Sequence, residues 1–371
     1  MSSLAARRNP ERANWQARSS RVVAPPLKPF AARLIDWQRS HGRRDLPWQA
    51  APDAYRVWIS EIMLQQTQVS SVIPYYLRFV SEFPDVRSLA AAPIDHVLRL
   101  WSGLGYYRRA HFLHRAAQTL VAEHAGVMPR DPKALTALPG IGRSTAAAIA
   151  ALAYGTRAAI LDGNVKRVLA RHAGIAGYPG DARVERALWK RAEEVLPESD
   201  IADYTQALMD LGATVCVRAA PRCSACPIRT DCRARRSGRV DQLPSPRPRK
   251  ALPRRKLKVL VVEQAGEVLL ERRPPAGVWA GLWSLPELET GADAARYCRK
   301  RFGAQVKPLA LLREIEHVFT HFRLTITPQR CVVQRWPAQA AEPGLIWLPL
   351  ADAAGAALPA PIKKLLRSLK P

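Results

Sequence analysis

The sequence contains no apolar run near the ~20 residues that a membrane-spanning helix requires. Its first twenty residues are rich in arginine but include no apolar stretch of the kind found in secretory signals, so we expect neither secretion nor a membrane partner. Acidic residues are scarce, with 31 Asp and Glu against 57 Lys and Arg, and the formal net charge is +26. A surplus of this size favours a polyanionic partner, with nucleic acid ahead of a membrane surface.

Cysteine is also scarce, and four of the six cysteines lie in one short segment with the spacing C-x6-C-x2-C-x5-C: Cys216, Cys223, Cys226 and Cys232. Four thiolates in one loop can ligate a tetrahedral zinc ion or a [4Fe–4S] cluster. Zinc ribbons usually contain two C-x2-C pairs, whereas only Cys223 and Cys226 form such a pair here. The pattern therefore predicts a metal or cluster site in a reducing compartment rather than a disulfide scaffold. Four arginines are expected around this loop: Arg218, Arg222, Arg229 and Arg233.

The chain is long enough for two domains, and its composition changes at three places. We predict a disordered basic tail, an all-α domain, a basic linker rich in Pro and Arg, and an α+β domain, over residues 1–27, 28–232, 233–256 and 257–371. The linker is expected to be extended, either lying along phosphates or solvated without contacts. The last domain is expected to open with a hairpin about Gly266 and to contain helices near 292–302 and at its C-terminal end. Cys298 and Cys331 within it are expected to be packing residues.

The all-α domain contains the stretch LPGIGRSTAAAIA, which begins with a turn from Leu138 to Gly142. Gly140 and Gly142 allow backbone angles that a side chain would forbid, so several N–H groups can point outward together. Arg143 and Ser144 then open an Ala-rich helix whose N-terminus adds a positive dipole end. The stretch predicts a clamp for backbone phosphates without base preference, although an ordinary interhelical turn has the same composition.

Glu61 lies within AYRVWISEIMLQQTQV, a predicted helix over residues 54–69 that is apolar on most sides. Gln65 and Gln68 follow one and two turns later on the same side. A carboxyl group in such a helix should be partly desolvated, and desolvation favours its neutral, proton-donating form. That is the form a general acid needs near neutral pH. The alternative is a glutamate on the exposed stripe of a core helix.

Asp162 follows the turn by about twenty residues, in LDGNV at the start of another predicted helix. An aspartate there is a typical N-cap, and a carboxylate fixed at a helix start is also well placed for chemistry. A second glycine-rich turn, GLGYYRR, places two tyrosines beside Arg108 and Arg109. This combination is suited to stacking on bases and holding phosphates, while core packing remains open for at least one tyrosine.

Taken in order, WISEIMLQQTQV, GLGYY, LPGIGRSTAAAI, LDGNVKRVLAR and the four-cysteine loop resemble the MutY-type adenine DNA glycosylases. The resemblance implies a multidomain protein: an all-α helix-hairpin-helix glycosylase domain with a [4Fe–4S] loop, then an α+β MutT/Nudix-like domain. It implies removal of adenine mispaired with 8-oxoguanine or guanine in double-stranded DNA, by a cytoplasmic, nucleoid-associated bacterial monomer. The four-cysteine spacing resembles the iron–sulfur loop of endonuclease III-type glycosylases.

The same resemblance implies roles for individual residues. Glu61 becomes the general acid at adenine N7, Asp162 the stabiliser of the cationic sugar, and Asn164 an orienting residue. Further residues are expected to contact DNA: Gln65, Gln66, Tyr106, Leu138, Gly140, Gly142, Arg143 and Ser144. Of these, Gln66 and Tyr106 are expected to occupy the gap beside the 8-oxoguanine.

Ser144 stands where bifunctional relatives carry a lysine that forms a Schiff base, so the resemblance implies a monofunctional glycosylase. In the C-terminal domain Phe319, Thr320 and His321 resemble the family loop that reads 8-oxoguanine, although an ordinary strand end would look the same. Tyr297, Lys300 and Arg301 stand where a Nudix hydrolase needs carboxylates for Mg²⁺, so hydrolysis is expected to be lost. The alternatives are an endonuclease III-like lyase for oxidised pyrimidines and a non-catalytic iron–sulfur DNA-binding protein.

Overall fold

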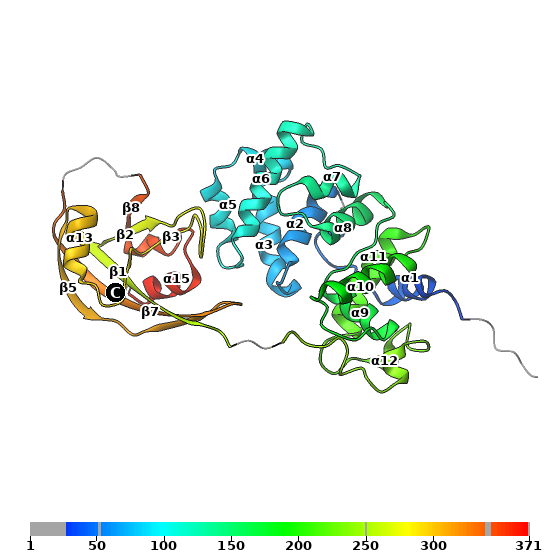
Figure 1. Ribbon diagram of the computed structural model, residues 1–371. Helices are drawn as coiled ribbons and strands as arrows, with labels where there is room; N and C mark the ends of the chain where they lie inside the picture. The colour runs from blue at the N-terminus through cyan, green and yellow to red at the C-terminus, as the bar shows by residue number, and fades with distance from the viewer. Residues whose placement is uncertain (1–26, 51–52, 249–250, 338–342, 370–371) are drawn as a thin grey trace, which may run out of the picture.

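The computed structural model describes residues 27–50, 53–248, 251–337 and 343–369. The predicted tail, residues 1–27, lies outside the described residues except for Leu27. Figure 1 shows two bodies side by side, one helical and one built around a sheet, joined by the segment that follows α12. None of the described helices is long and apolar enough to cross a membrane.

The helical body follows the prediction of an all-α domain and holds twelve described α-helices, one π-helical turn and one 3-10 turn. The α-helices are α1 (Phe30–His41), α2 (Ala54–Leu64), α3 (Val69–Glu82), α4 (Val86–Ala91), α5 (Ile94–Trp101), α6 (Arg108–Glu123), α7 (Pro132–Ala137), α8 (Arg143–Tyr154), α9 (Gly163–Ala173), α10 (Ala182–Glu194), α11 (Ile201–Asp210) and α12 (Arg233–Arg236). The π-helical turn is η1 (Leu211–Val215) and the 3-10 turn is η2 (Cys223–Ala225).

Two hydrophobic cores lie inside the helical body, and α8 is the wall between them. Ile149 and Ala150 of α8 belong to the core that also contains the apolar side of α2. Ala147 and Ala148 of the same helix belong to the core around α9 and α11. The small side chains of this helix allow close packing on both sides, so it packs against α2, the helix of Glu61, on one side and against α11 on the other.

The second body is a mixed sheet with helices on both faces, which agrees with the α+β prediction. Its strands are β1 (Arg254–Gln264), β2 (Glu267–Arg272), β3 (Trp283–Ser284), β4 (Glu287–Leu288), β5 (Gln305–Leu311), β6 (Ile315–Val318), β7 (Arg323–Arg335) and β8 (Leu345–Pro349). The central order is β3-β2-β1-β7-β5, with β1 and β7 parallel and the other pairs antiparallel. The helices are α13 (Ala294–Phe302), α14 (Leu350–Ala353) and α15 (Ala360–Ser368).

Alternation along β1 explains why the sheet is covered on both sides. Val259 and Val261 point into the core formed with α15, whereas Leu260 and Val262 point into the core formed with α13. The predicted hairpin about Gly266, the helix near 292–302 and the C-terminal helix are all present. The sequence did not predict β5 or β8, because β5 is mostly exposed and β8 is half-buried along its length, so neither strand alternates clearly between apolar and polar residues.

The predicted linker is extended only in part. Residues 233–236 form α12, and Leu243 is buried against the helical body. The guanidinium of Arg171 binds this segment, since its Nε donates to the carbonyls of Val240 at 3.0 Å and Leu243 at 2.8 Å. At its other end the segment runs into β1, which already begins at Arg254. The remaining extended part is therefore shorter than the composition suggested.

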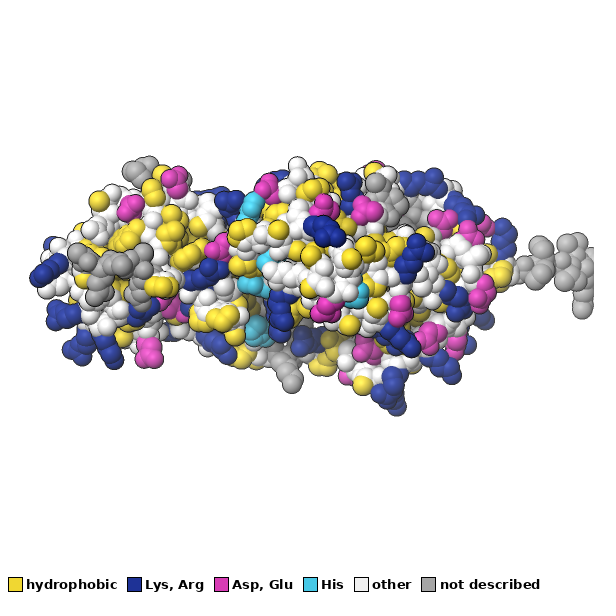
Figure 2. Space-filling model, turned by 90° about the horizontal axis from the view of Figure 1, so that it is seen from above, with side chains coloured by type: hydrophobic (Ala, Val, Ile, Leu, Met, Phe, Trp, Pro, Cys, Tyr) yellow, Lys and Arg dark blue, Asp and Glu magenta, His cyan; other side chains and the backbone are white. Residues whose placement is uncertain are grey.

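The two bodies are in direct contact through α5 and α6. Arg272 of β2 forms a two-point ion pair with Asp95, at 2.5 and 3.1 Å. A ring nitrogen of His111 on α6 lies 3.1 Å from the carbonyl oxygen of Ala280. Seen from above, histidine side chains lie along the boundary between the bodies (Figure 2). Leu282 of the second body is fully buried in a core of the first, so the contact includes apolar packing.

Candidate active site

Helix α2 carries Glu61 with its apolar neighbours turned inward. The helix starts at Asp53, whose side chain accepts a hydrogen bond from the N–H of Arg56 at 2.9 Å. Trp58 and Ile59 are fully buried, while Glu61 is half-buried and lines a cavity. Burial, and to a smaller extent the nearby charge of Asp162, raise the pKa of the Glu61 carboxyl to about 8. Glu61 therefore does not lie on an exposed stripe, and its carboxyl is protonated at neutral pH.

Asp162 is the N-cap of α9, as its sequence context predicts. Its Oδ1 accepts a hydrogen bond from the backbone N–H of Val165 at 2.7 Å. Burial raises the pKa of this carboxyl, whereas the Val165 N–H and the charge of Arg167 lower it. The capping bond fixes the position of the carboxylate and leaves its other oxygen available.

Both carboxyl groups line one large cavity of about 970 Å³. Six residues named in the sequence analysis line it: Glu61, Gln65, Gln66, Ser144, Asp162 and Asn164. Its walls come from α1, α2, α8, α9 and α11, so segments distant in the sequence converge on one space. The remaining predicted DNA-contact residues lie outside this lining: Tyr106, Leu138, Gly140, Gly142 and Arg143.

Asn164 belongs to a hydrogen-bonded group that the sequence analysis did not predict. Arg167 Nη2 donates to Asn164 Oδ1 at 2.8 Å and to the carbonyl of Gly212 at 2.6 Å, and its Nε donates to the carbonyl of Cys216 at 2.7 Å. Gly212 is required here, because a Cβ at this position would lie 2.6 Å from the Cβ of Asn164. This group connects the cavity to the first cysteine of the loop.

The turn between α7 and α8 contains one glycine with a positive φ rather than two. Gly140 has φ +79°, and a Cβ there would lie 2.6 Å from the Cβ of Phe112. Gly142 is the N-cap of α8 with φ −87°, a conformation open to any residue, so the prediction of unusual angles at Gly142 was wrong. The side chain of Arg143 lies over the ring of Trp189, 3.8 Å from its centroid. The turn still presents free N–H groups at the start of α8, a helix of 12 residues.

The helix of Glu61 is shorter than predicted. It ends at Leu64, so Gln65 is its C-cap and Gln68 does not lie on the same helix face as Glu61. Gln66 is exposed and has φ +58°. Tyr106 is 46 % exposed and has φ +50°. Two predicted DNA-contact residues thus share a left-handed backbone conformation, which non-glycine residues adopt at an energetic cost.

Phe319, Thr320 and His321 form the turn between β6 and β7, so the trio is indeed at a strand end. The ring of Phe319 is stacked on Phe322 at 4.4 Å and lies 5.5 Å from Trp279. On the other face of the sheet, α13 carries Tyr297, Lys300 and Arg301 at the positions where a Nudix hydrolase needs carboxylates for Mg²⁺. The turn therefore presents an aromatic cluster made by Phe319, Phe322 and Trp279.

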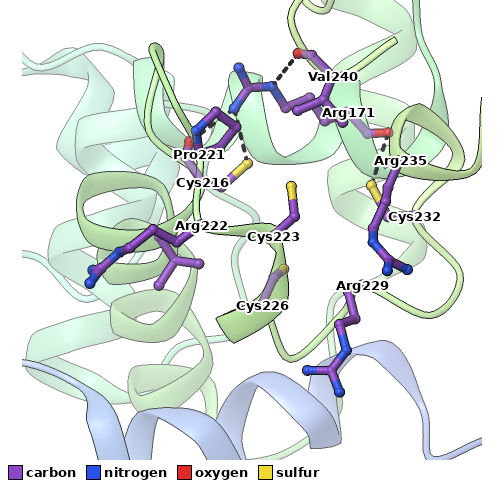
Figure 3. Close-up of a pocket in the computed structure, with 11 residues that line it drawn as sticks. Arg171, Cys216, Pro221, Arg222, Cys223, Cys226, Arg229, Cys232, Arg235 and Val240 are labelled. Atoms are coloured by element: carbon purple, nitrogen blue, oxygen red, sulfur yellow. Dashed lines mark hydrogen bonds between the residues drawn. The ribbon is translucent and has the colours of Figure 1, made fainter. Parts of the chain in front are cut away.

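The four predicted cysteines face one another around a second cavity (Figure 3). Arg171 donates to the sulfur of Cys216 at 3.4 Å, and the thiol of Cys232 points at the Arg171 carbonyl at 3.6 Å. Arg171 was not predicted, because it comes from α9 rather than from the loop. Of the expected arginines Arg222 and Arg229 line the cavity, and Arg235 joins them.

As free thiols two of these cysteines resist ionisation. Burial raises the pKa of Cys226 to about 12 and also raises the pKa of Cys232. Among the described residues, no group of three or more His, Cys, Asp or Glu side chains is placed to hold a metal ion.

Two segments of the chain match known protein families. Residues 59–194 match the HhH-GPD superfamily of base excision DNA repair proteins, and residues 258–368 match the NUDIX domain. The adenine DNA glycosylase of Buchnera aphidicola subsp. Baizongia pistaciae is 34% identical over 92% of this chain and 97% of its own. The adenine DNA glycosylase of Mus musculus is 36% identical over 91% of this chain and 77% of its own. Among solved structures, a thermostable thymine-DNA glycosylase is 29% identical over 56% of this chain and 95% of its own, with a TM-score of 0.50.

Proposed function

The chain belongs to the adenine DNA glycosylase family, and we propose that it removes adenine mispaired with 8-oxoguanine or guanine from double-stranded DNA. One observation carries this proposal. Glu61 and Asp162 line the same cavity, and burial keeps the carboxyl of Glu61 protonated near neutral pH. One carboxyl can therefore donate a proton while the other holds negative charge.

Breaking the N-glycosidic bond of adenine requires both groups. Cleavage of this bond leaves a base that needs a proton and a sugar that becomes cationic. In our proposal Glu61 protonates adenine N7, and Asp162 stabilises the oxocarbenium-like sugar, a division of labour known from glycoside hydrolysis. Asn164, held by Arg167, orients the sugar-facing side of the site. Water then completes the hydrolysis.

Adenine must leave the base stack before it can enter the cavity. We assign the backbone phosphates to the turn of Leu138, Gly140 and Gly142 with Arg143, because free N–H groups at a helix start attract phosphate. Gln66 and Tyr106 are assigned to the gap beside the 8-oxoguanine, with Gln65 and Ser144 lining the cavity itself. These contacts would hold one duplex against a monomer, in keeping with the basic charge of the chain.

Ser144 supports a monofunctional enzyme. A lyase of this fold needs an amine that can form a Schiff base with the sugar, and a hydroxyl cannot do so. The hydroxyl of Ser144 is already engaged, because it accepts a hydrogen bond from the N–H of Leu161 at 2.9 Å. We therefore propose base removal without strand cleavage.

The sheet body is assigned to recognition of the opposite base. Phe319, Thr320 and His321 offer a ring to stack on a base and two polar groups to contact its edges. Tyr297, Lys300 and Arg301 supply no carboxylates for Mg²⁺, so we assign no hydrolysis of nucleotides to this body.

The four cysteines suit a [4Fe–4S] cluster better than a zinc ion. A structural zinc ion requires four ligands converging on one centre at about 2.3 Å, whereas a cluster accepts one thiolate at each iron and fills more space. The four cysteines line one cavity, and only Cys223 and Cys226 have the C-x2-C spacing that is typical of a zinc ribbon. Cys216, Cys223, Cys226 and Cys232 would hold the cluster, which would shape the basic loop around it. No step of the reaction depends on it.

The decisive experiment measures base release from a duplex with adenine opposite 8-oxoguanine, read with and without alkali. A duplex with an oxidised pyrimidine opposite guanine runs in parallel, and Glu61→Gln is the inactive control. We expect adenine release from the first duplex, strand breaks only after alkali, and no release by Glu61→Gln with duplex binding almost intact. Cleavage of the pyrimidine duplex without alkali would instead support an endonuclease III-like lyase. Binding without any base release would support a non-catalytic protein.

A further inference from the structure

Arg109 in the first turn of α6 points into the protein rather than toward solvent, contrary to the expectation that it holds phosphates. Its Nη1 donates to three carbonyl oxygens at the end of α2: Ile62 at 2.8 Å, Met63 at 2.8 Å and Gln65 at 2.7 Å. The last carbonyls of a helix have no partner within it and form its negative end, so a guanidinium there caps the helix and balances its dipole. The helix capped in this way carries Glu61.

The second terminal nitrogen of the guanidinium, Nη2, connects the segment after α2 to a second loop. Arg109 Nη2 donates to the hydroxyl of Thr67 at 3.3 Å and to the carbonyl of Gly105 at 3.2 Å. The same Gly105 carbonyl accepts from the indole N–H of Trp101 at 3.0 Å. The guanidinium carbon lies 5.4 Å from the ring centroid of Trp101 and 5.3 Å from that of Tyr106. One side chain therefore ties the loop of residues 65–67 to the loop of residues 105–106.

Each of these loops contains a residue with a left-handed backbone that is not glycine. They are Gln66, with φ +58°, and Tyr106, with φ +50°. Such conformations are costly and persist only where the surroundings impose them. The hydrogen bonds of Arg109 go to the residue before Gln66, the residue after it and the residue before Tyr106. They are thus placed to impose both conformations at once.

The charge of Arg109 serves this role without a carboxylate among its hydrogen-bond partners. All five acceptors are carbonyls or a hydroxyl, and two aromatic faces cover the planar group. Burial lowers the pKa of the guanidinium to about 10, so it remains charged at neutral pH. A planar fork can reach both loops together, whereas the single ammonium of lysine cannot.

We propose that Arg109 is a positioning residue that holds Gln66 and Tyr106 at a fixed distance from each other and from the helix of Glu61. The inference rests on the proposed function, in which these two residues fill the gap beside the 8-oxoguanine. Arg109 does not touch the DNA in this role. Its contribution is the rigidity of the pair that separates the adenine from its partner base.

The test compares Arg109→Met and Arg109→Lys with Arg115→Met, an exposed arginine on the same helix. Single-turnover adenine release is measured on duplexes with adenine opposite 8-oxoguanine and opposite guanine, together with duplex affinity and the melting temperature. Arg109→Met should lower the rate on the 8-oxoguanine duplex by about tenfold to a hundredfold, since displacement of a positioning group by about 1 Å has a cost of this size. Duplex affinity should change by less than about threefold, because phosphate contacts carry it. Arg109→Lys should fall between the two, and Arg115→Met should match the wild type.

Two readouts separate positioning from a merely structural role. The preference for 8-oxoguanine over guanine should narrow in Arg109→Met, whereas partial unfolding would lower both rates equally. The effects of Arg109→Met and Tyr106→Ala on the rate should also be non-additive, because both remove the same pair. An unchanged preference together with additive effects would overturn the proposal, as would a wild-type rate in Arg109→Met. If that variant does not fold, Arg109→Lys with the same cycle decides. Lack of adenine release by the wild type would refute the proposed function instead.

Discussion

The hydroxyl of Ser144 accepts a hydrogen bond from the backbone N–H of Leu161 at 2.9 Å, which ties the first turn of α8 to the residue before Asp162. The donor belongs to Leu161, which is 3% exposed, and the bond itself is partly buried. The position that sets the chemical class of the site in our proposal thus also supports the segment that leads into Asp162.

Ser144→Ala should therefore affect stability and rate together. Leaving a buried N–H without an acceptor costs about 1–3 kcal/mol, and release of the Leu161 segment allows Asp162 to move. We expect a lower free energy of unfolding in urea and a lower single-turnover rate of adenine release. Full activity in a variant destabilised by this amount would show that Asp162 is held by its capping bond alone.

The raised pKa of Glu61 predicts how the rate depends on pH. In the proposed mechanism the protonated carboxyl is the active form, so the rate of base release should be level below neutral pH and fall about tenfold per pH unit above about 8. Single-turnover rates between pH 6 and pH 9.5 on one duplex measure this. A rate that rises through the same range would mean that Glu61 acts as a base.

The same shift has a consequence for stability with a defined sign. The folded pKa of Glu61 lies above the ordinary value of 4.5, so its favourable contribution is complete below that value and is lost as the pH rises through about 8. Glu61→Gln cannot ionise and keeps the contribution throughout. Its melting temperature relative to wild type should therefore increase from pH 5 to pH 8.5, although the variant is inactive. Equal differences at both pH values would contradict burial as the cause.

Mutation of Asp210, whose carboxylate holds Arg43 and Gln206 of the cavity wall, is expected to be costly. Its fully buried carboxylate accepts from Arg43 Nη2 at 2.6 Å, from the Arg43 backbone N–H at 2.8 Å and from Gln206 at 2.9 Å. Asp210→Ala leaves a charge without its partner and should lower the free energy of unfolding by about 3–5 kcal/mol. Asp203→Ala, which breaks an exposed ion pair, should cost less than about 1 kcal/mol. Comparable urea midpoints for the two variants would refute this.

The cysteine loop predicts iron in the purified protein. We expect a brown protein with broad absorption near ~400 nm and iron rather than zinc on elemental analysis. Cys223→Ser should lose the colour, whereas Cys298→Ala, in the sheet body, should keep it. A colourless, zinc-loaded and fully active protein would contradict the assignment.

The turn of Phe319 predicts selectivity for the opposite base without a role in the chemical step. Phe319→Ala should lower the rate on adenine opposite 8-oxoguanine and leave the rate opposite guanine nearly unchanged. Val318→Ala, at the exposed neighbouring position, is the matched control. Loss of both rates to the same extent would place the turn in general DNA binding.

Local patterns in the sequence were sufficient for the elements that depend on near neighbours. The helix of Glu61 follows from apolar spacing, and the N-cap role of Asp162 follows from its place before a helix. The four cysteines that line one cavity were evident because they are close in the chain. In each case the signal and the structure it produces lie within a few residues of one another.

The tertiary structure alone decided what depends on residues far apart in the chain. Helix α2 ends at Leu64, where the guanidinium of Arg109 donates hydrogen bonds to its last carbonyls. No local pattern in the sequence marks that end. Arg171 reaches the cysteine loop from α9. Strands β1 and β7 are parallel neighbours in the sheet, although five strands separate them in the sequence. A sequence specifies these contacts only through the packing of whole elements, because a donor and its acceptor can come from any two segments that the core brings together.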